Sequence, residues 1–356
     1  MRRLALLTLL LAAGCYYAVK ANPHPQVLAT LAAIGSRFDV ASLGEIQAVL
    51  AAGGEAAGLA YTTTIKKAAD IRSAYELGVR VFTADSPNEI DKIAAAAPGA
   101  WVFVRIAVDN AGAAAPFGTK FGCDPTLAAD LLRRIARAGL MPAGISCHVG
   151  SQQTDVYAWD EPIRAAAVIY HQLANELPTR FVLNLGGGLP ATYTQPVPPI
   201  GQYAAAIATS LTKHFGSTWP QLVLEPGRAI AASSGQLDCE VVQVTERRGE
   251  RWVYLDVGRY GGLAEVEGEA IKYPLHAPHV SGPVGPVILA GPTADGDDVI
   301  YQKHRPDLPL ALRAGDLVRL GCTGAYTASY ASVAFNGIEP LSTCVTDSDL
   351  PLLSAS

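Results

Sequence analysis

Short apolar runs recur along the first two-thirds of the chain, and each ends in a polar residue or a glycine. Runs of about four to eight residues that are bounded in this way are typical of buried β-strands. The predicted strands are Tyr16–Asn22, Arg37–Ser42, Gly58–Thr62, Arg80–Asp85, Trp101–Ile106, Gly144–Val149, Phe181–Gly186 and Gln221–Pro226.

Alanine-rich segments lie between these runs, and their apolar residues recur with the helical period of about 3.6 residues. The predicted helices are Pro25–Ile34, Leu43–Ala52, Lys67–Leu77, Pro87–Ala96, Leu127–Ala138, Glu161–Leu177 and Gly201–Phe215. Alternation of strands with helices indicates a parallel sheet, and eight such units predict an α/β protein with a (β/α)8 barrel of the TIM type.

The pattern changes after about residue 231, where short β-rich segments are separated by glycine and proline with little helical period. Such segments are Leu237–Val244, Arg251–Asp256, Val287–Ala290 and Leu317–Leu320. We therefore expect two domains: the barrel in residues 1–230 and a C-terminal all-β domain in residues 231–356.

The composition fits two folded domains and narrows the function. Half of the 356 residues are apolar and the net charge is −5, with no basic run, which disfavours nucleic-acid binding. The six cysteines form no CxxC pair, so a disulfide framework or a metal site is not expected, and reduced thiols in the cytoplasm are the simpler interpretation.

The N-terminus permits two interpretations. Arg2-Arg3, the apolar residues Leu4–Ala13 and then Cys15 resemble a lipoprotein export signal. A short barrel helix that leads into the first strand explains the same residues, and we favour it because apolar runs of about 10–14 residues are more often core helices. No later run is long and apolar enough to span a membrane.

The carboxyl ends of barrel strands form the active site of such folds, and here they carry chemically capable residues. These are Lys20, Asp39, Arg105, His148, Gly186–Gly188, Glu225 and Arg228. Each has a structural alternative when it is taken alone. Lys20 could be a salt-bridged structural lysine, Glu225 an ion-pair partner of Arg228, and Asp39 with Arg105 a buried ion pair. His148 could be a core histidine, and the glycines could serve a turn.

The order of motifs removes most of this ambiguity. The motifs are Tyr17–Pro25, Phe38–Ser42, Lys120–Gly122, His148–Ser151, Gly186–Gly188, Glu225–Arg228, Gly291–Thr293, Gly324–Thr327 and Phe335–Gly337. Together they resemble the pyridoxal-phosphate (PLP) dependent decarboxylases for ornithine, lysine, arginine and diaminopimelate, most of all the ornithine/lysine branch of polyamine biosynthesis. The resemblance covers nearly the whole chain, although the family normally carries a further N-terminal segment.

The resemblance implies a role for each residue at the barrel mouth. Lys20 forms a Schiff base with PLP, which also removes the cost of a buried ammonium. Glu225 contacts the pyridine nitrogen, His148 stacks on the ring, and Asp39 and Arg105 assist in positioning. The residues implied to hold the phosphate are Ser151, Gly187, Gly188, Arg228 and Tyr326.

The resemblance also implies a homodimer with shared active sites. The Gly291–Thr293 loop and Phe335 face the partner's cofactor, and Lys120 and Asp298 match positions that pair across the interface. Asp295 and Glu269 are the positions implied for binding the distal amine of a small cationic amino acid, a site in which an unpaired carboxylate would penalise a neutral substrate. Asp295 could instead serve only the turn of its glycine-rich loop.

Ala294 is the main departure from the family, because a cysteine that returns a proton to the substrate carbon is expected there. A water or another side chain could supply this proton to give an amine. Alternatively, the protein is a decarboxylating transaminase or oxidative deaminase that releases an aldehyde. It could also be a non-catalytic homologue like the antizyme inhibitors, but the complete cofactor cradle counts against this. A barrel racemase fits the motifs poorly.

Overall fold

The computed structural model describes residues 13–116, 118–173, 176 and 181–346. The two interpretations of residues 1–12 lie outside this range, as does the C-terminal tail 347–356. The chain forms two compact units. The first comprises residues up to Pro190 together with Pro198–Gly227, and the second comprises Ala191–Val197 and the residues from Arg228 onward. The predicted domain boundary at residue 230 assigned Ala191–Val197 to the barrel, whereas these residues belong to the second unit.

The first unit is a closed barrel of parallel strands in the order β1-β10-β9-β7-β5-β4-β3-β2. The strands are β1 (Gly14–Ala18), β2 (Arg37–Val40), β3 (Leu59–Tyr61), β4 (Val81–Ala84), β5 (Trp101–Arg105), β7 (Met141–Ser146), β9 (Val182–Asn184) and β10 (Gln221–Leu224). This confirms the predicted (β/α)8 barrel.

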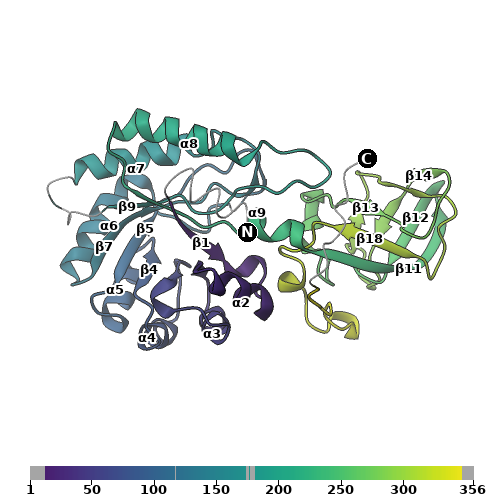
Figure 1. The fold of residues 1–356 in the computed structure, drawn as a ribbon, viewed down its shortest axis with the longest axis horizontal. Coiled ribbons are helices and arrows are strands. Elements are labelled where there is room, and N and C mark those ends of the chain that lie inside the picture. Colours follow the sequence, from purple (N-terminus) through teal and green to yellow (C-terminus); the bar gives the residue numbers. More distant parts are fainter. Residues whose placement is uncertain (1–12, 117, 174–175, 177–180, 347–356) are drawn as a thin grey trace. The chain divides into compact units, whose positions relative to one another are not determined.

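The barrel helices lie on the outside of the strands, in purple to green in Figure 1. They are α2 (Pro25–Ala33), α3 (Leu43–Ala51), α4 (Ala68–Glu76), α5 (Pro87–Ala96), α6 (Pro125–Arg137), α7 (Asp160–Gln172) and α8 (Ile200–Phe215). Helices α2, α5 and α6 begin at a proline, whose missing N–H is harmless in the first turn. Side chains of Ser42 and Ser86 accept hydrogen bonds at the starts of α3 and α5.

Strand β7 lies about three residues earlier than predicted, and this changes the position of His148. A Cβ at Gly144 would collide with the carbonyl oxygen of Val182, so the neighbouring strands approach too closely for any side chain there. The strand ends at Ser146, and His148 therefore lies in the loop beyond it. That loop runs into the short strand β8 (Ser151–Gln153), which pairs with β6 (Ala113–Ala115).

The second unit is built from β-strands, as predicted. A six-stranded sheet has the order β13-β18-β11-β12-β15-β16, and β14 pairs separately with β17. The strands are β11 (Gln236–Arg247), β12 (Glu250–Leu255), β13 (Leu275–His276), β14 (Val284–Pro286), β15 (Ile288–Ala290), β16 (Val299–Tyr301), β17 (Asp307–Pro309) and β18 (Leu317–Gly321). Three short helical turns matter below: α9 (Arg228–Ala231), η4 (Ala264–Glu269) and η6 (Phe335–Gly337). Within the described ranges, no helix has both the length and the apolar character needed to cross a membrane.

Candidate active site

Lys20 lies just beyond β1, in the short helical turn η1 (Val19–Ala21), and its ammonium group is held by a buried carboxylate. Its Nζ is 2.7 Å from Oδ2 of Asp39, which is only 1% exposed at the end of β2. The hydroxyl of Thr62 donates to the other oxygen of Asp39. The lysine side chain itself remains partly exposed. Asp39 therefore orients a lysine that can still be reached.

Asp39 forms its ion pair with Lys20 and not with Arg105, so the alternative of a buried Asp39–Arg105 pair is wrong. The guanidinium of Arg105 lies over the ring of Phe121, 5.3 Å from its centre. Arg105 and His148 line a cavity of about 180 Å³ beside β5, together with Asn110, Phe121 and neighbouring loop residues.

Glu225 is 8% exposed and lies directly after β10. The amide of Asn184 donates to its Oε1 at 2.5 Å, and the carbonyl oxygen of the same amide accepts from the N–H of Gly186 at 2.9 Å. Burial, together with the negative charge of Asp39, raises the pKa of Glu225 to about 7. A carboxyl group poised in this way can exchange a proton with a ligand near neutral pH.

His148 is a neutral imidazole. Its Nδ1 accepts the N–H of Gly150 at 3.1 Å, which leaves the ring proton on Nε2. Burial holds the pKa of His148 well below its usual range, and the positive charges of Arg105 and Lys20 lower it further. A neutral ring can pack against a protonated aromatic ligand without repulsion.

The three glycines after β9 are required by their neighbours. A Cβ at Gly186, where φ is +65°, would collide with the carbonyl oxygen of Cys147. At Gly187 it would lie 2.9 Å from Nε2 of His148, and at Gly188 it would lie 2.7 Å from the carbonyl oxygen of Gly150. Packing therefore excludes side chains at these three positions, and a backbone without side chains is also what a phosphate cradle requires.

Arg228 is 3% exposed and belongs to the second unit. Its ion pair is with Glu265, at 2.5 Å from Nη2 to Oε1 and 2.7 Å from Nη1 to Oε2, and not with Glu225 as the structural alternative required. Nη1 also donates to the hydroxyl of Tyr193 at 2.9 Å, and the ring of Tyr326 lies 4.8 Å from the guanidinium carbon. Sequence reasoning missed both Glu265 and Tyr193.

The loop that contains Ala294 is closed by Asp298, which is 2% exposed. One oxygen of this carboxylate accepts the N–H of Arg259 at 2.7 Å, and the other accepts the N–H and hydroxyl of Thr293 at 3.0 and 2.7 Å. Within this chain the oxygens of Asp298 hold the loop together, and its pairing with Lys120 across an interface stays a prediction.

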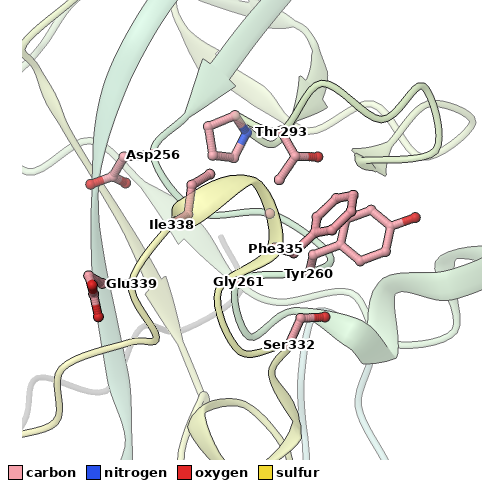
Figure 2. A pocket seen from close by; sticks show the side chains of 10 residues that line it. Asp256, Tyr260, Gly261, Thr293, Ser332, Phe335, Ile338 and Glu339 are labelled. Carbon is pink, nitrogen blue, oxygen red and sulfur yellow. The ribbon is translucent and has the colours of Figure 1, made fainter.

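Ala294 and Asp295 are exposed on this loop. The N–H of Ala294 donates to Oδ1 of Asn336 at 2.8 Å, which ties the loop to η6. Figure 2 shows Phe335 against Tyr260, with ring centres 4.8 Å apart, beside a pocket of only about 10 Å³. A pocket of that size holds at most one water.

The carboxylate of Glu269, which the resemblance implies for binding an amine, is engaged by backbone groups of its own unit, and its role in binding an amine stays a prediction. Its carboxylate accepts the N–H groups of Gln302, Lys303 and His304 at 2.6–2.8 Å. Burial works to raise the pKa of Glu269, but these three donors outweigh it and hold the pKa below its usual range. Glu269 thus stabilises the turn after β16.

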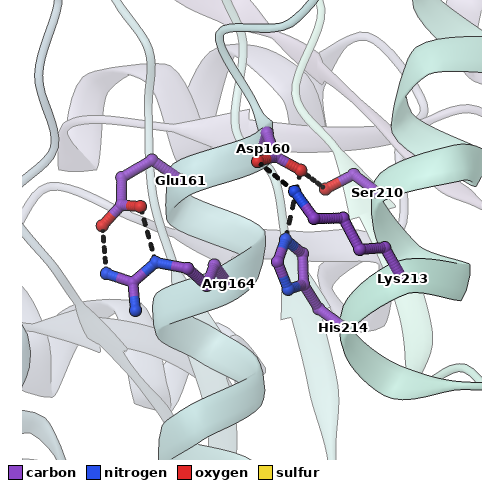
Figure 3. Close-up of polar contacts among 6 residues, drawn as sticks. All are labelled: Asp160, Glu161, Arg164, Ser210, Lys213 and His214. Carbon is purple, nitrogen blue, oxygen red and sulfur yellow. Dashed lines mark hydrogen bonds and ion pairs between the residues drawn. The ribbon is translucent and has the colours of Figure 1, made fainter.

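A further polar cluster joins α7 to α8 on the outside of the barrel (Figure 3). Asp160 accepts from Ser210 at 2.7 Å, from His214 at 3.1 Å and from Lys213 at 3.2 Å. A catalytic triad requires the histidine to stand between the serine and the aspartate. Here Ser210 and His214 both contact the carboxylate of Asp160, so the histidine does not stand between the other two residues. The cluster therefore serves to hold α7 against α8.

The residues at the barrel mouth fit a PLP cofactor: an accessible lysine, a buried carboxyl with a raised pKa, a neutral imidazole and a glycine turn without space for side chains. Together with the barrel and the all-β domain, they define the class of PLP-binding barrel enzymes. The family model for the pyridoxal-binding domain of pyridoxal-dependent decarboxylases matches residues 2–232. The chain belongs to this decarboxylase family, whose cofactor is PLP.

Within the family, the chain is similar to lysine/ornithine decarboxylases. It is 36% identical over 328 residues to the lysine/ornithine decarboxylase of Selenomonas ruminantium, over 91% of this chain and 81% of the relative. The lysine/ornithine decarboxylase of Vibrio vulnificus, solved with cadaverine, superimposes with a TM-score of 0.87 at 34% identity, over 98% of this chain and 92% of the other. Antizyme inhibitor 2 of Xenopus laevis is 31% identical over 91% of this chain and 74% of its own length.

Proposed function

We propose that this protein decarboxylates a basic amino acid of the ornithine or lysine type, or a related conjugate, to an amine and CO2. The observation that carries the proposal is the arrangement at the carboxyl ends of the barrel strands: Lys20 held by Asp39, Glu225 held by Asn184, and neutral His148. The similarity to enzymes solved with cadaverine and with putrescine supports a cationic substrate.

PLP supplies, when bound, the electron-accepting ring that makes loss of CO2 feasible. Lys20 would bind the aldehyde carbon of the cofactor, with Asp39 keeping its Nζ in place. Glu225 would hold a proton at the pyridine nitrogen, and the buried position of its carboxyl group suits this exchange. His148 would pack on the ring face without adding a positive charge.

We propose that the phosphate of the cofactor is held by backbone N–H groups of Gly187 and Gly188, by Ser151, and by Arg228 with Tyr326. The run of glycines supports this assignment, because a backbone without side chains can present its N–H groups to an anion. Arg228 adds a planar donor of hydrogen bonds, which suits a phosphate.

We further propose a homodimer in which the loop of Ala294 and Asp295, with Phe335, serves the cofactor of the other subunit. The exposure of both loop residues supports this, and so does the pocket beside Phe335, whose volume of about 10 Å³ is too small for a substrate. Asp295 would then bind the distal amine of the substrate.

Since the cysteines are thiols, we propose the cytoplasm as the location.

One observation raises the question of a second product: the side chain of Ala294, on the exposed loop, is a methyl group. A methyl group has no proton to donate. With PLP bound, delivery of a proton to the substrate carbon from elsewhere would give the amine. Without such delivery, hydrolysis by water would give an aldehyde, with the amino group retained as pyridoxamine phosphate.

One experiment tests both products. The purified protein is incubated with PLP and with ornithine, lysine, arginine or diaminopimelate, and CO2, amine, aldehyde and cofactor absorbance are measured together. Lys20→Ala is the control, and we expect it to abolish CO2 release. Amine with stable PLP absorbance supports the decarboxylase, and aldehyde with pyridoxamine phosphate supports the alternative. Failure of the wild type to bind PLP would overturn both and leave a binding homologue.

A further inference from the structure

The buried guanidinium of Arg228 is held on three sides by residues of its own unit. Both oxygens of Glu265 meet its terminal edge, at 2.5 and 2.7 Å. The hydroxyl of Tyr193 accepts from Nη1 at 2.9 Å, and the guanidinium carbon lies over the ring of Tyr326, 4.8 Å from its centre. These contacts come from three segments far apart in the sequence, and together they fix both the position and the plane of the guanidinium.

We propose that Glu265 is a positioning residue that orients Arg228 toward the phosphate of the cofactor. The proposal rests on the assignment of Arg228 to the phosphate made above. Glu265 itself acts through the arginine.

The chemistry favours orientation over simple charge. The Arg228–Glu265 pair has no net charge, so an anion gains from the pair mainly through the directed N–H donors of a fixed guanidinium plane. Arg228 is almost fully buried, and a buried guanidinium that loses its carboxylate is left without its counter-charge. Removal of Glu265 would therefore allow the guanidinium and the turn around it to shift.

The same helical turn offers a matched control. Glu267 lies two residues further along η4 and also forms an ion pair, with Arg259 at 2.7 Å, but its side chain is 73% exposed. A change at Glu267 removes the same charge from the same segment without touching Arg228. Any effect of overall charge or of the turn would thus appear in both variants, whereas an effect through Arg228 appears only in one.

The experiment compares two ligands that differ only in the phosphate. Apoprotein is titrated with PLP and with pyridoxal, and binding is followed by cofactor absorbance, for wild type, Glu265→Gln, Glu265→Ala, Glu267→Gln and Arg228→Lys. Thermal unfolding of each apoprotein is recorded alongside.

We expect Glu265→Ala to weaken PLP binding about tenfold and pyridoxal binding by less than about twofold, with Glu265→Gln between it and wild type. Glu267→Gln should match wild type. An equal loss for PLP and pyridoxal, or a lower melting temperature without a change in their affinity ratio, would mean that Glu265 is only structural. Tighter PLP binding would mean that Glu265 competes with the phosphate. Both results overturn the proposal.

Arg228→Lys separates this proposal from the one on which it rests. If the lysine variant keeps the wild-type ratio of PLP to pyridoxal affinity, the assignment of Arg228 to the phosphate is wrong. If that ratio falls for Arg228→Lys but not for either variant of Glu265, only the positioning role is wrong.

Discussion

Glu225 should make the apoprotein less stable as the pH rises. The carboxyl group is buried, its amide partner Asn184 donates one hydrogen bond, and its pKa is raised to about 7. In the unfolded chain a glutamate has a pKa of about 4.3. The folded state therefore keeps its proton over a pH range in which the unfolded state has lost it, and stability falls with rising pH across that window.

The magnitude follows from the pKa difference. The folded-state pKa of about 7 lies above the ordinary value of 4.5 by 7 − 4.5, or about 2.5 units. At about 1.4 kcal/mol per unit, the full penalty is about 3–4 kcal/mol. It is absent well below the unfolded pKa and complete above the folded one. Between pH 5 and pH 8 the expected loss is about 2–3 kcal/mol.

The assay is urea unfolding of the PLP-free protein at a series of pH values, for wild type and Glu225→Gln. The amide keeps the shape of the side chain and can still accept from Asn184, but it cannot ionise. The stability of wild type relative to the variant should fall by about 2–3 kcal/mol from pH 5 to pH 8. Parallel curves would refute the reasoning, since they would show that Glu225 titrates alike in the folded and unfolded states.

Three further changes test other parts of the site. Ala294→Cys should raise the ratio of amine to aldehyde measured by chromatography, and an unchanged ratio would show that this position does not set the product. Gly187→Ala would place a Cβ 2.8 Å from the carbonyl oxygen of Glu225, and we expect it to cost about 1–3 kcal/mol in urea unfolding and to weaken PLP binding. Gly201→Ala is its control, because no atom lies within 4 Å of the added Cβ, and equal effects of the two would contradict the argument. Glu269→Ala should lower stability by about 1 kcal/mol at neutral pH, because three N–H donors of a largely exposed turn exchange the carboxylate for water. Since the pKa of Glu269 is lowered, this difference should shrink as the pH falls through that pKa, and a constant difference would be evidence against the role.

Much of the site could be predicted because its landmarks are local in the sequence. Lys20, His148, Glu225 and the glycines each lie near the carboxyl end of a strand, and the barrel fold brings such ends together. The strand boundaries were less predictable. The strand β7 was predicted to begin at Gly144 because a glycine usually marks a strand end. This glycine lies inside the strand, where Val182 of a neighbouring strand approaches closely.

The sequence by itself determined the barrel, the β-rich second unit and the set of chemically capable residues, since strand and helix periods and turn residues act over a few neighbours. Only the tertiary structure decided which charged side chains form ion pairs with one another. Lys20 pairs with Asp39, 19 residues away, and Arg228 pairs with Glu265, 37 residues away. Glu269 and Asp298 satisfy backbone N–H groups of loops and turns. The physical reason is that a carboxylate takes its partner from the donors that packing brings within about 3 Å, and sequence spacing does not specify those donors.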